Sequence, residues 1–147
     1  MNKRQWIPLA GLAATFVAAI YMVAMLSAQA QTELSANFTT AATAEVRNEQ
    51  AQTVLRGQFV VNDEDDDDVE RKAALTATDI EPGAAGEAEV EFPKTTVVTQ
   101  DVEFSVTGLK PSAKYIMVID GRDVTTVTTD KRGKAEIELE VRMPSGK

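Results

Sequence analysis

The sequence contains no cysteine and no histidine, and each absence excludes a class of protein. Without cysteine there is no disulfide framework, so a folded domain must be stabilised by packing a hydrophobic core. Without histidine there is no Ser-His-Asp triad, no usual zinc or copper ligand set, and no imidazole general base. A conventional hydrolase or redox metalloenzyme is therefore not expected. We expect a protein that is not an enzyme and that needs no cofactor.

Aromatic residues are also scarce, at 5% of the chain. After Phe38 the only ones are Phe59, Phe92, Phe104 and Tyr115. All four fit positions that the sequence pattern assigns to a core, so few remain to line a pocket for a carbohydrate or another small ligand.

The N-terminal residues have the layout of a secretory signal peptide. Lys3 and Arg4 precede an uncharged apolar run over residues 7–26, and Ala28-Gln29-Ala30 supplies a small-x-small cleavage motif. We predict a signal peptide over residues 1–30. The alternative is an uncleaved membrane anchor, because the apolar run, at about 20 residues, is long enough to cross a bilayer. In both cases we expect the rest to be secreted or held in a bacterial periplasm or cell envelope.

The charge balance narrows the range of partners. The formal net charge of the whole chain is −8. Residues 1–30 hold two basic residues and no acidic one, so the remainder carries −10. Nucleic acid and anionic lipid are poor partners for such a chain. We expect a partner among envelope or extracellular proteins, and membrane contact only if the N-terminal segment stays uncleaved.

The pattern after the signal predicts one all-β domain. Residues 31–52 have no sustained period and are predicted to be a flexible linker, and residues 144–147 a short tail. Between them, over residues 53–143, seven short β-type runs alternate with turn residues. "EAEVEF" and "KAEIELEV" alternate strictly between apolar and acidic residues, which is typical of strands with one buried face. We predict an antiparallel Greek-key β-sandwich of about seven strands, immunoglobulin-like in architecture.

Two turns in this region carry a specific backbone prediction. Asp120-Gly121 lies between two β-type runs and predicts a type I′ hairpin, in which both central residues need positive φ. Gly133, in "DKRG", is predicted to take the left-handed position of a longer hairpin loop. Glutamates on the exposed strand faces are expected to discourage edge-to-edge association.

The stretch "VTGLKPSAKYIMVIDG" resembles a segment of fibronectin type III domains, in which a Leu-x-Pro-x-x-x-Tyr element leads into a central strand. Leu109, Pro111 and Tyr115 match that element. The resemblance implies a tyrosine corner, with the Tyr115 hydroxyl bonded to a nearby backbone group in a structural role. The early-strand tryptophan of that family is missing here.

Residues 73–128 are also similar to the opening strands of copper-zinc superoxide dismutase and chordin-type sandwiches, through "AALTATDIEPGAAGEAEVEF" followed by "QDVEFSVTGLKP". In the dismutases the following strand carries metal-binding histidines. Here that strand reads "KYIMVIDG", so the resemblance implies a fold without dismutase activity.

The most conspicuous motif is the acidic run "DEDDDD". It offers calcium ligands, and the candidates are Asp63, Asp65, Asp66, Asp67 and Asp68. An EF-hand loop starting at Asp63 would need Gly at its sixth position and Glu at its twelfth, where this chain has Asp68 and Ala74. We therefore expect a solvated loop without a metal site. Weak calcium binding or contact with a basic protein remain the alternatives.

These features together predict a non-enzymatic exported module with a structural or protein-contact role in the cell envelope or outside the cell. The alternatives are a carbohydrate- or small-ligand-binding module, and a weak calcium-binding domain that uses the acidic loop.

Overall fold

The computed structural model describes residues 34–62 and 67–146, whose regular secondary structure consists of β-strands. The predicted export signal lies outside the described residues. In the described part no helix is long and apolar enough to cross a membrane. The strands are β1 (Thr43–Asn48), β2 (Thr53–Gln58), β3 (Val60–Asn62), β4 (Asp68–Ala77), β5 (Ala85–Pro93), β6 (Thr99–Thr107), β7 (Lys114–Ile119), β8 (Arg122–Thr128) and β9 (Ala135–Arg142).

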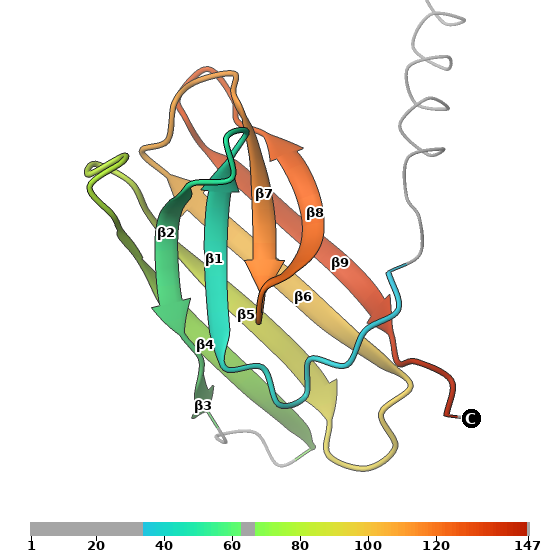
Figure 1. Cartoon of the computed structure of the whole chain (residues 1–147). Coiled ribbons are helices and arrows are strands. Elements are labelled where there is room, and N and C mark those ends of the chain that lie inside the picture. Colours follow the sequence, from blue (N-terminus) through green and yellow to red (C-terminus); the bar gives the residue numbers. More distant parts are fainter. Residues whose placement is uncertain (1–33, 63–66, 147) are drawn as a thin grey trace, which may run out of the picture. The chain divides into compact units, whose positions relative to one another are not determined.

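All the strands belong to one antiparallel sheet in the order β8-β7-β1-β2-β4-β5-β6-β9, with β3 paired to β4 beside it. The sheet curls into a nearly closed, barrel-like form (Figure 1). Strands β4, β5 and β6 form a meander. The chain then crosses from β6 to β7, which pairs with β1, and from β8 to β9, which pairs with β6.

The all-β antiparallel prediction is confirmed, whereas a sandwich of about seven strands is not. Each of the seven predicted runs forms strand, but the first divides into β2 and β3, and β1 is added. Period-two alternation marks one buried face and does not distinguish a sandwich from a barrel. The register shifts at Val46/Arg47 and Met117/Val118 have the form of β-bulges, which bend and twist strands and so help one sheet to curl.

The prediction of a flexible linker over residues 31–52 is wrong for residues 34–52. Strand β1 lies in this range and pairs with β2 on one side and with β7 on the other. Ala44 and Val46 of β1 are fully buried. The sequence hides this strand because its inward side chains are small and its alternation lasts for only six residues.

The core lies on the concave side of the curled sheet. On the β5, β6 and β9 strands, Val90 stands opposite Val102 and Phe104 opposite Ile137, so the apolar side chains meet in rows. The largest fully buried side chains include Tyr115, Phe104, Leu55 and Met117. The alternation of the sequence therefore assigns the inner face of these strands correctly.

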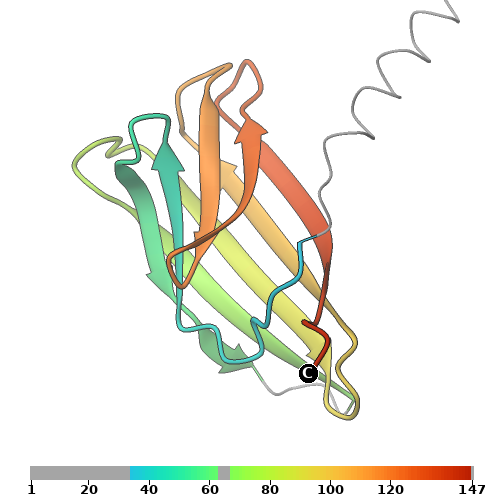
Figure 2. The ribbon, with the colours of Figure 1, turned by 45° about the vertical axis from the view of Figure 1, so that its right-hand side comes forward.

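The chain enters the sheet through an extended segment over residues 34–42, here called the strap. It runs across one end of the sheet from β9 to the start of β1 (Figures 1 and 2). The buried side chain of Gln100 accepts the Phe38 N–H at 2.6 Å and donates to the Ala36 carbonyl at 2.8 Å. The Ala36 N–H donates to the carbonyl of Arg142 at 3.1 Å. A buried glutamine thus satisfies strap backbone groups that no strand reaches.

Both turn predictions are confirmed. Asp120 and Gly121 have φ values of 48° and 78°, which are the positive values that a type I′ turn needs, and Gly133 has a φ of 74°. The Asp120 carboxylate also accepts the N–H groups of Ala42 and Thr43 at 2.9 and 2.8 Å. The β7–β8 turn therefore fixes the end of the strap where β1 begins.

Candidate functional site

The outer surface of β4, β5, β6 and β9 carries most of the exposed acidic side chains of these strands. Because most of their inner positions are apolar, the alternate positions face solvent, and the sequence places glutamate or aspartate at most of them. We call this surface the acidic face; its carboxylates are Glu70, Glu87, Glu89, Glu91, Asp101, Glu103, Glu136, Glu138 and Glu140.

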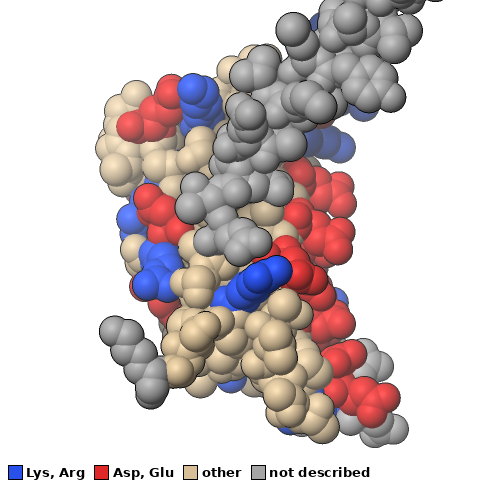
Figure 3. Space-filling model, turned by 90° about the vertical axis from the view of Figure 1, so that its right-hand side faces the viewer, with Lys and Arg blue, Asp and Glu red and all other residues tan. Residues whose placement is uncertain are grey.

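The strand register sets these carboxylates directly beside one another. One row across the strands joins Glu91, Asp101 and Glu140. The next row joins Glu89, Glu103 and Glu138. Acidic side chains are gathered along one side of the molecule in Figure 3. Like charges that stand directly opposite each other in a sheet destabilise it, so the acidic face opposes folding.

One lysine offsets part of this charge. The ammonium group of Lys72 lies 2.8 Å from the carboxylate of Glu70 and 3.5 Å from that of Glu89. Its hydrogen bond lowers the pKa of Glu70, to which the side chain of Asn62 also donates at 2.8 Å. The pKa of Glu89 is instead raised to about 7, mainly by burial and further by the hydrogen bond and charge of Glu70. Glu70 and Glu89 therefore both contact the Lys72 ammonium, but Glu89 keeps its proton up to a higher pH than Glu70 does.

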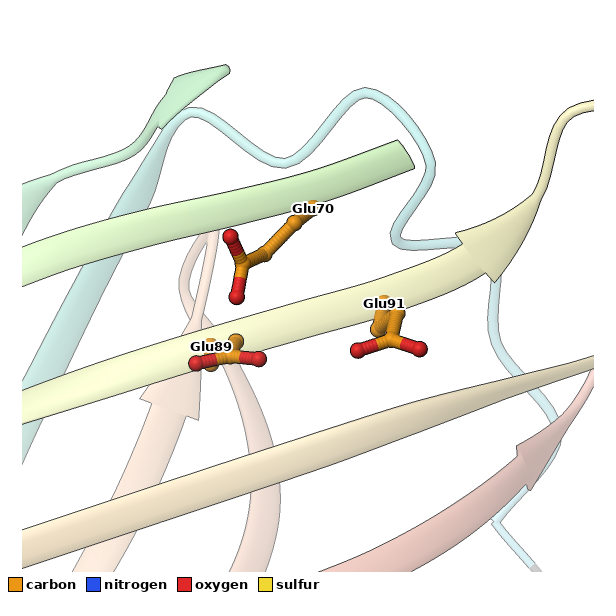
Figure 4. Close-up of side chains that lie close together, drawn as sticks. All are labelled: Glu70, Glu89 and Glu91. Atoms are coloured by element: carbon orange, nitrogen blue, oxygen red, sulfur yellow. The ribbon is translucent and has the colours of Figure 1, made fainter. Parts of the chain in front are cut away.

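The tightest group on the acidic face is Glu70, Glu89 and Glu91, whose carboxylate oxygens lie within 4.8 Å of one another (Figure 4). Such a group can attract a cation. It offers three carboxylates, whereas calcium takes about six to eight oxygen ligands. The Lys72 ammonium also already holds two of the three, and a metal ion would have to displace it. The single ammonium offsets the charge of only one carboxylate, so the cluster is partly neutralised and offers too few ligands for a calcium centre.

Of the calcium candidates in the acidic run, the two that the structure describes, Asp67 and Asp68, do not join this cluster. Asp63, Asp65 and Asp66 lie outside the described residues. The Asp67 carbonyl accepts the Lys94 N–H at 2.9 Å, and Asp68 begins β4 opposite Pro93. Within the described ranges, the carboxylates that converge come from β4 and β5.

Tyr115 of the fibronectin-like element takes part in a buried hydrogen-bond network. The Tyr115 hydroxyl accepts the Lys110 N–H at 3.0 Å and donates to the Glu81 carboxylate at 2.7 Å. Tyr115 is 1% exposed and Glu81 is 8% exposed. Burial, followed by the carboxylate, raises the pKa of Tyr115 to about 12. Leu109 is buried, whereas Pro111 is exposed.

Sequence reasoning missed Glu81 and Gln100. Glu81 precedes Pro82-Gly83 and has the appearance of an exposed turn residue, and Gln100 follows a polar stretch. Both become buried only through partners far along the chain: Tyr115 lies 34 residues from Glu81, and Phe38 lies 62 residues from Gln100. No local pattern signals such partners.

A groove of about 710 Å³ lies where the sheet fails to close. Its lining comes from β6, β8, β9 and the loop between the last two, and includes Val106, Val127, Ala135 and Ile137. Among the residues that the structure describes, no aromatic side chain lines it. We call the boundary between β8 and β9, which contains this groove, the seam.

No protein-family model, curated protein or solved structure matches the chain. The resemblances noted in the sequence therefore rest on their short motifs alone. The function has to be argued from the acidic face and the seam.

Proposed function

We propose that this chain is an exported, non-enzymatic β-sheet module that acts by contact. Its acidic face binds a positively charged protein partner in the cell envelope or outside the cell. The observation that carries the proposal is the register of the acidic face, which sets carboxylate beside carboxylate in successive rows.

The opposed carboxylates of these rows destabilise the free protein, and a cationic partner would remove this destabilisation. Each directly opposed like-charge pair costs some fraction of about 1 kcal/mol. Lys or Arg side chains of a partner, placed between the rows, would replace repulsion with attraction. Electrostatic complementarity of this kind speeds association and selects partners by charge.

Two other functions have weaker support. A carbohydrate or small-ligand site is disfavoured because the groove has no aromatic lining and the core aromatics Phe104 and Tyr115 are buried. A calcium site is disfavoured because the tightest carboxylate group offers only three carboxylates, and Lys72 already pairs with two of them.

The test compares two variants of equal net charge. The face variant changes the middle row, with Glu89→Gln, Glu103→Gln and Glu138→Gln. The control variant removes three exposed acids elsewhere, with Glu49→Gln, Asp79→Asn and Asp123→Asn. The probe is a flexible peptide of alternating Gly and Lys, and its affinity for the full chain is measured by calorimetry at low and at physiological salt.

The proposal expects the face variant to bind the peptide about tenfold more weakly than the wild type, since each exposed ion pair is worth about 0.5 kcal/mol. The control variant should lose less than about half of that free energy, because its charges lie off the face. Equal losses in the two variants would show that only net charge matters, and the proposal would then be rejected.

A further inference from the structure

The curled sheet has two ends that do not join. Among the described strands, β8 pairs only with β7, and β9 pairs only with β6. The two strands are linked by the loop after Thr128, and the groove lies beside that loop. At the other end of the seam the strap fills the space: the Ser35 carbonyl accepts from the Arg122 guanidinium at 3.4 Å, and Ser35 forms a parallel bridge with Arg142.

The backbone groups of β9 that face the seam can be identified from its neighbours. The Met143 N–H donates to the Val98 carbonyl, on the β6 side, whereas the Arg142 carbonyl accepts the Ala36 N–H, on the seam side. Backbone groups of successive strand residues point to opposite edges. Following this alternation back along β9, the N–H and carbonyl groups of Glu136, Glu138 and Glu140 face the seam.

The strap already makes the first contacts of a new strand at this edge. Its Ala36 N–H bonds to Arg142, and Ser35 pairs with Arg142 in parallel. The strap turns away from β9 after this point toward β1 (Figure 2). The β9 edge therefore accepts an extended neighbour, and described residues supply one only at its last position.

The floor of the seam is apolar and incompletely covered. Ile137 and Leu139 of β9 point inward but are only partly buried. Their cross-strand partners on β6, Phe104 and Val102, are fully buried. The inward side chains of β9 are thus more exposed than those of β6, as expected if one more strand is needed to cover β9.

From this geometry we propose that the seam takes an extended segment of the cationic partner as an added strand along β9. Every second side chain of that segment would be apolar and enter the groove above Ile137. The intervening side chains would be Lys or Arg and lie beside Glu136, Glu138 and Glu140. This inference rests on the proposed function, and it specifies the mode of binding as strand addition at a sheet edge.

A second copy of this chain is a poorer occupant. Antiparallel pairing of β9 with β9 of another copy would bring the three edge glutamates of each copy against those of the other. Like charges directly opposite each other destabilise a strand pair. The same glutamates that repel a second β9 would attract a basic strand.

The experiment uses a peptide of alternating Val and Lys, with the flexible Gly and Lys peptide as a control of equal charge. Hydrogen exchange of the backbone amides is measured by NMR on the full chain. Addition of the Val and Lys peptide should slow exchange at Glu136, Glu138 and Glu140 by about tenfold or more, because each amide would gain a strand partner. The Gly and Lys peptide should leave these amides unchanged.

Glu138→Pro and Glu103→Gln form a matched pair, since each removes one charge from the same row. The proline removes an N–H that β6 does not use, which an edge strand tolerates, and it blocks strand addition. We expect Glu138→Pro to weaken the binding of the Val and Lys peptide by about tenfold, and Glu103→Gln to weaken it by about twofold. If Glu138→Pro does not fold, the exchange measurement on the wild type still decides.

Three outcomes would overturn the inference. If the two variants weaken peptide binding equally and the peptide slows exchange at none of the three amides, strand addition is rejected. The proposed contact by charge would still stand. Slow exchange at the three amides before any peptide is added would mean that the chain itself or a second copy occupies the seam. Sedimentation would distinguish these two cases, because only the second copy doubles the mass. Failure of both peptides to bind would reject the proposed function as well.

Discussion

The two halves of the curled sheet have similar inner faces and very different outer ones. In the half formed by β8, β7, β1 and β2, the outward Glu45 stands opposite Arg56 and forms an ion pair with Arg47 at 2.6 Å. In the half formed by β4, β5, β6 and β9, Glu103 stands between Glu89 and Glu138. Charges are thus matched in the first half and opposed in the second.

This difference shows which surface charges the fold requires and which it only tolerates. Both halves bury apolar rows, such as Val46 beside Met117 in one and Val102 beside Val90 in the other. The fold therefore does not require acidic rows on its outer surface, because the matched half achieves the same burial without them. Solubility alone would be served by mixed charges. The acidic face is therefore a property of one surface that burial of the core does not explain, and we propose that it serves contact with a cationic partner.

The largest expected effect comes from the hydrogen bond that joins the two halves. Glu81 lies in the turn between β4 and β5, and Tyr115 lies on β7. Tyr115→Phe should lower the free energy of unfolding by about 2 kcal/mol, since the buried Glu81 carboxylate would lose one of its two donors and keep only the Lys110 N–H. Denaturant unfolding measures this loss.

The same bond has an alkaline signature. The pKa of Tyr115 is raised to about 12, so the folded form holds its proton more tightly than an unfolded chain, whose tyrosine titrates near 10. This contribution to stability is complete below about pH 10 and is lost as the pH rises toward 12. Tyr115→Phe should remove that part of the alkaline loss. An unchanged melting temperature and an unchanged alkaline profile would together mean that the network contributes nothing.

A smaller effect is expected from reversing one charge in each half. Glu103→Lys should stabilise the protein by about 1 kcal/mol, because the new lysine would lie between Glu89 and Glu138. Glu45→Lys should destabilise it by about 0.5 kcal/mol, because Arg47 would lose its partner. Melting temperatures at low salt compare the two. If both substitutions shift the melting temperature in the same direction, the outer charges of the two halves do not differ in their effect on stability.

The smallest effect concerns pH. The pKa of Glu89 is raised to about 7, so the folded state takes up this proton more readily than the unfolded chain. The resulting stability is fully present below the usual value of 4.5 and is lost as the pH rises to about 7. The melting temperature should therefore rise by a few degrees between about pH 7 and pH 5. Glu89→Gln should flatten this rise, whereas Glu45→Gln should leave it in place.

Sequence reasoning succeeded where the signal is local. Strict alternation in "EAEVEF" and "KAEIELEV" identified strands and their buried sides, and Asp120-Gly121 identified its turn. It failed where burial depends on distant partners. The strap and β1 are too poor in large apolar residues to show a period, and partners distant in the sequence, such as β7, β9 and Gln100, make them part of the core.

The candidate site shows the same limit. The adjacent aspartates of the acidic run dominate the sequence, yet the acidic face comes from glutamates spaced two apart on several strands. Each strand alone suggests only a solvated surface. Their charges meet because β5, β6 and β9 align in a register that crossovers determine, and no single strand contains that information.

The pairing of Ala36 with Arg142 also determines when folding can finish. The first described residues bond to the last strand, and Ser35 and its partner Arg122 are 87 residues apart. Contacts of such long sequence separation form slowly, because a long loop must close before they are made. A chain that emerges N-terminus first can assemble the β4–β6 meander early, but β1 must wait for β7 and the strap must wait for β9. The fold is therefore completed only after β9 has been released.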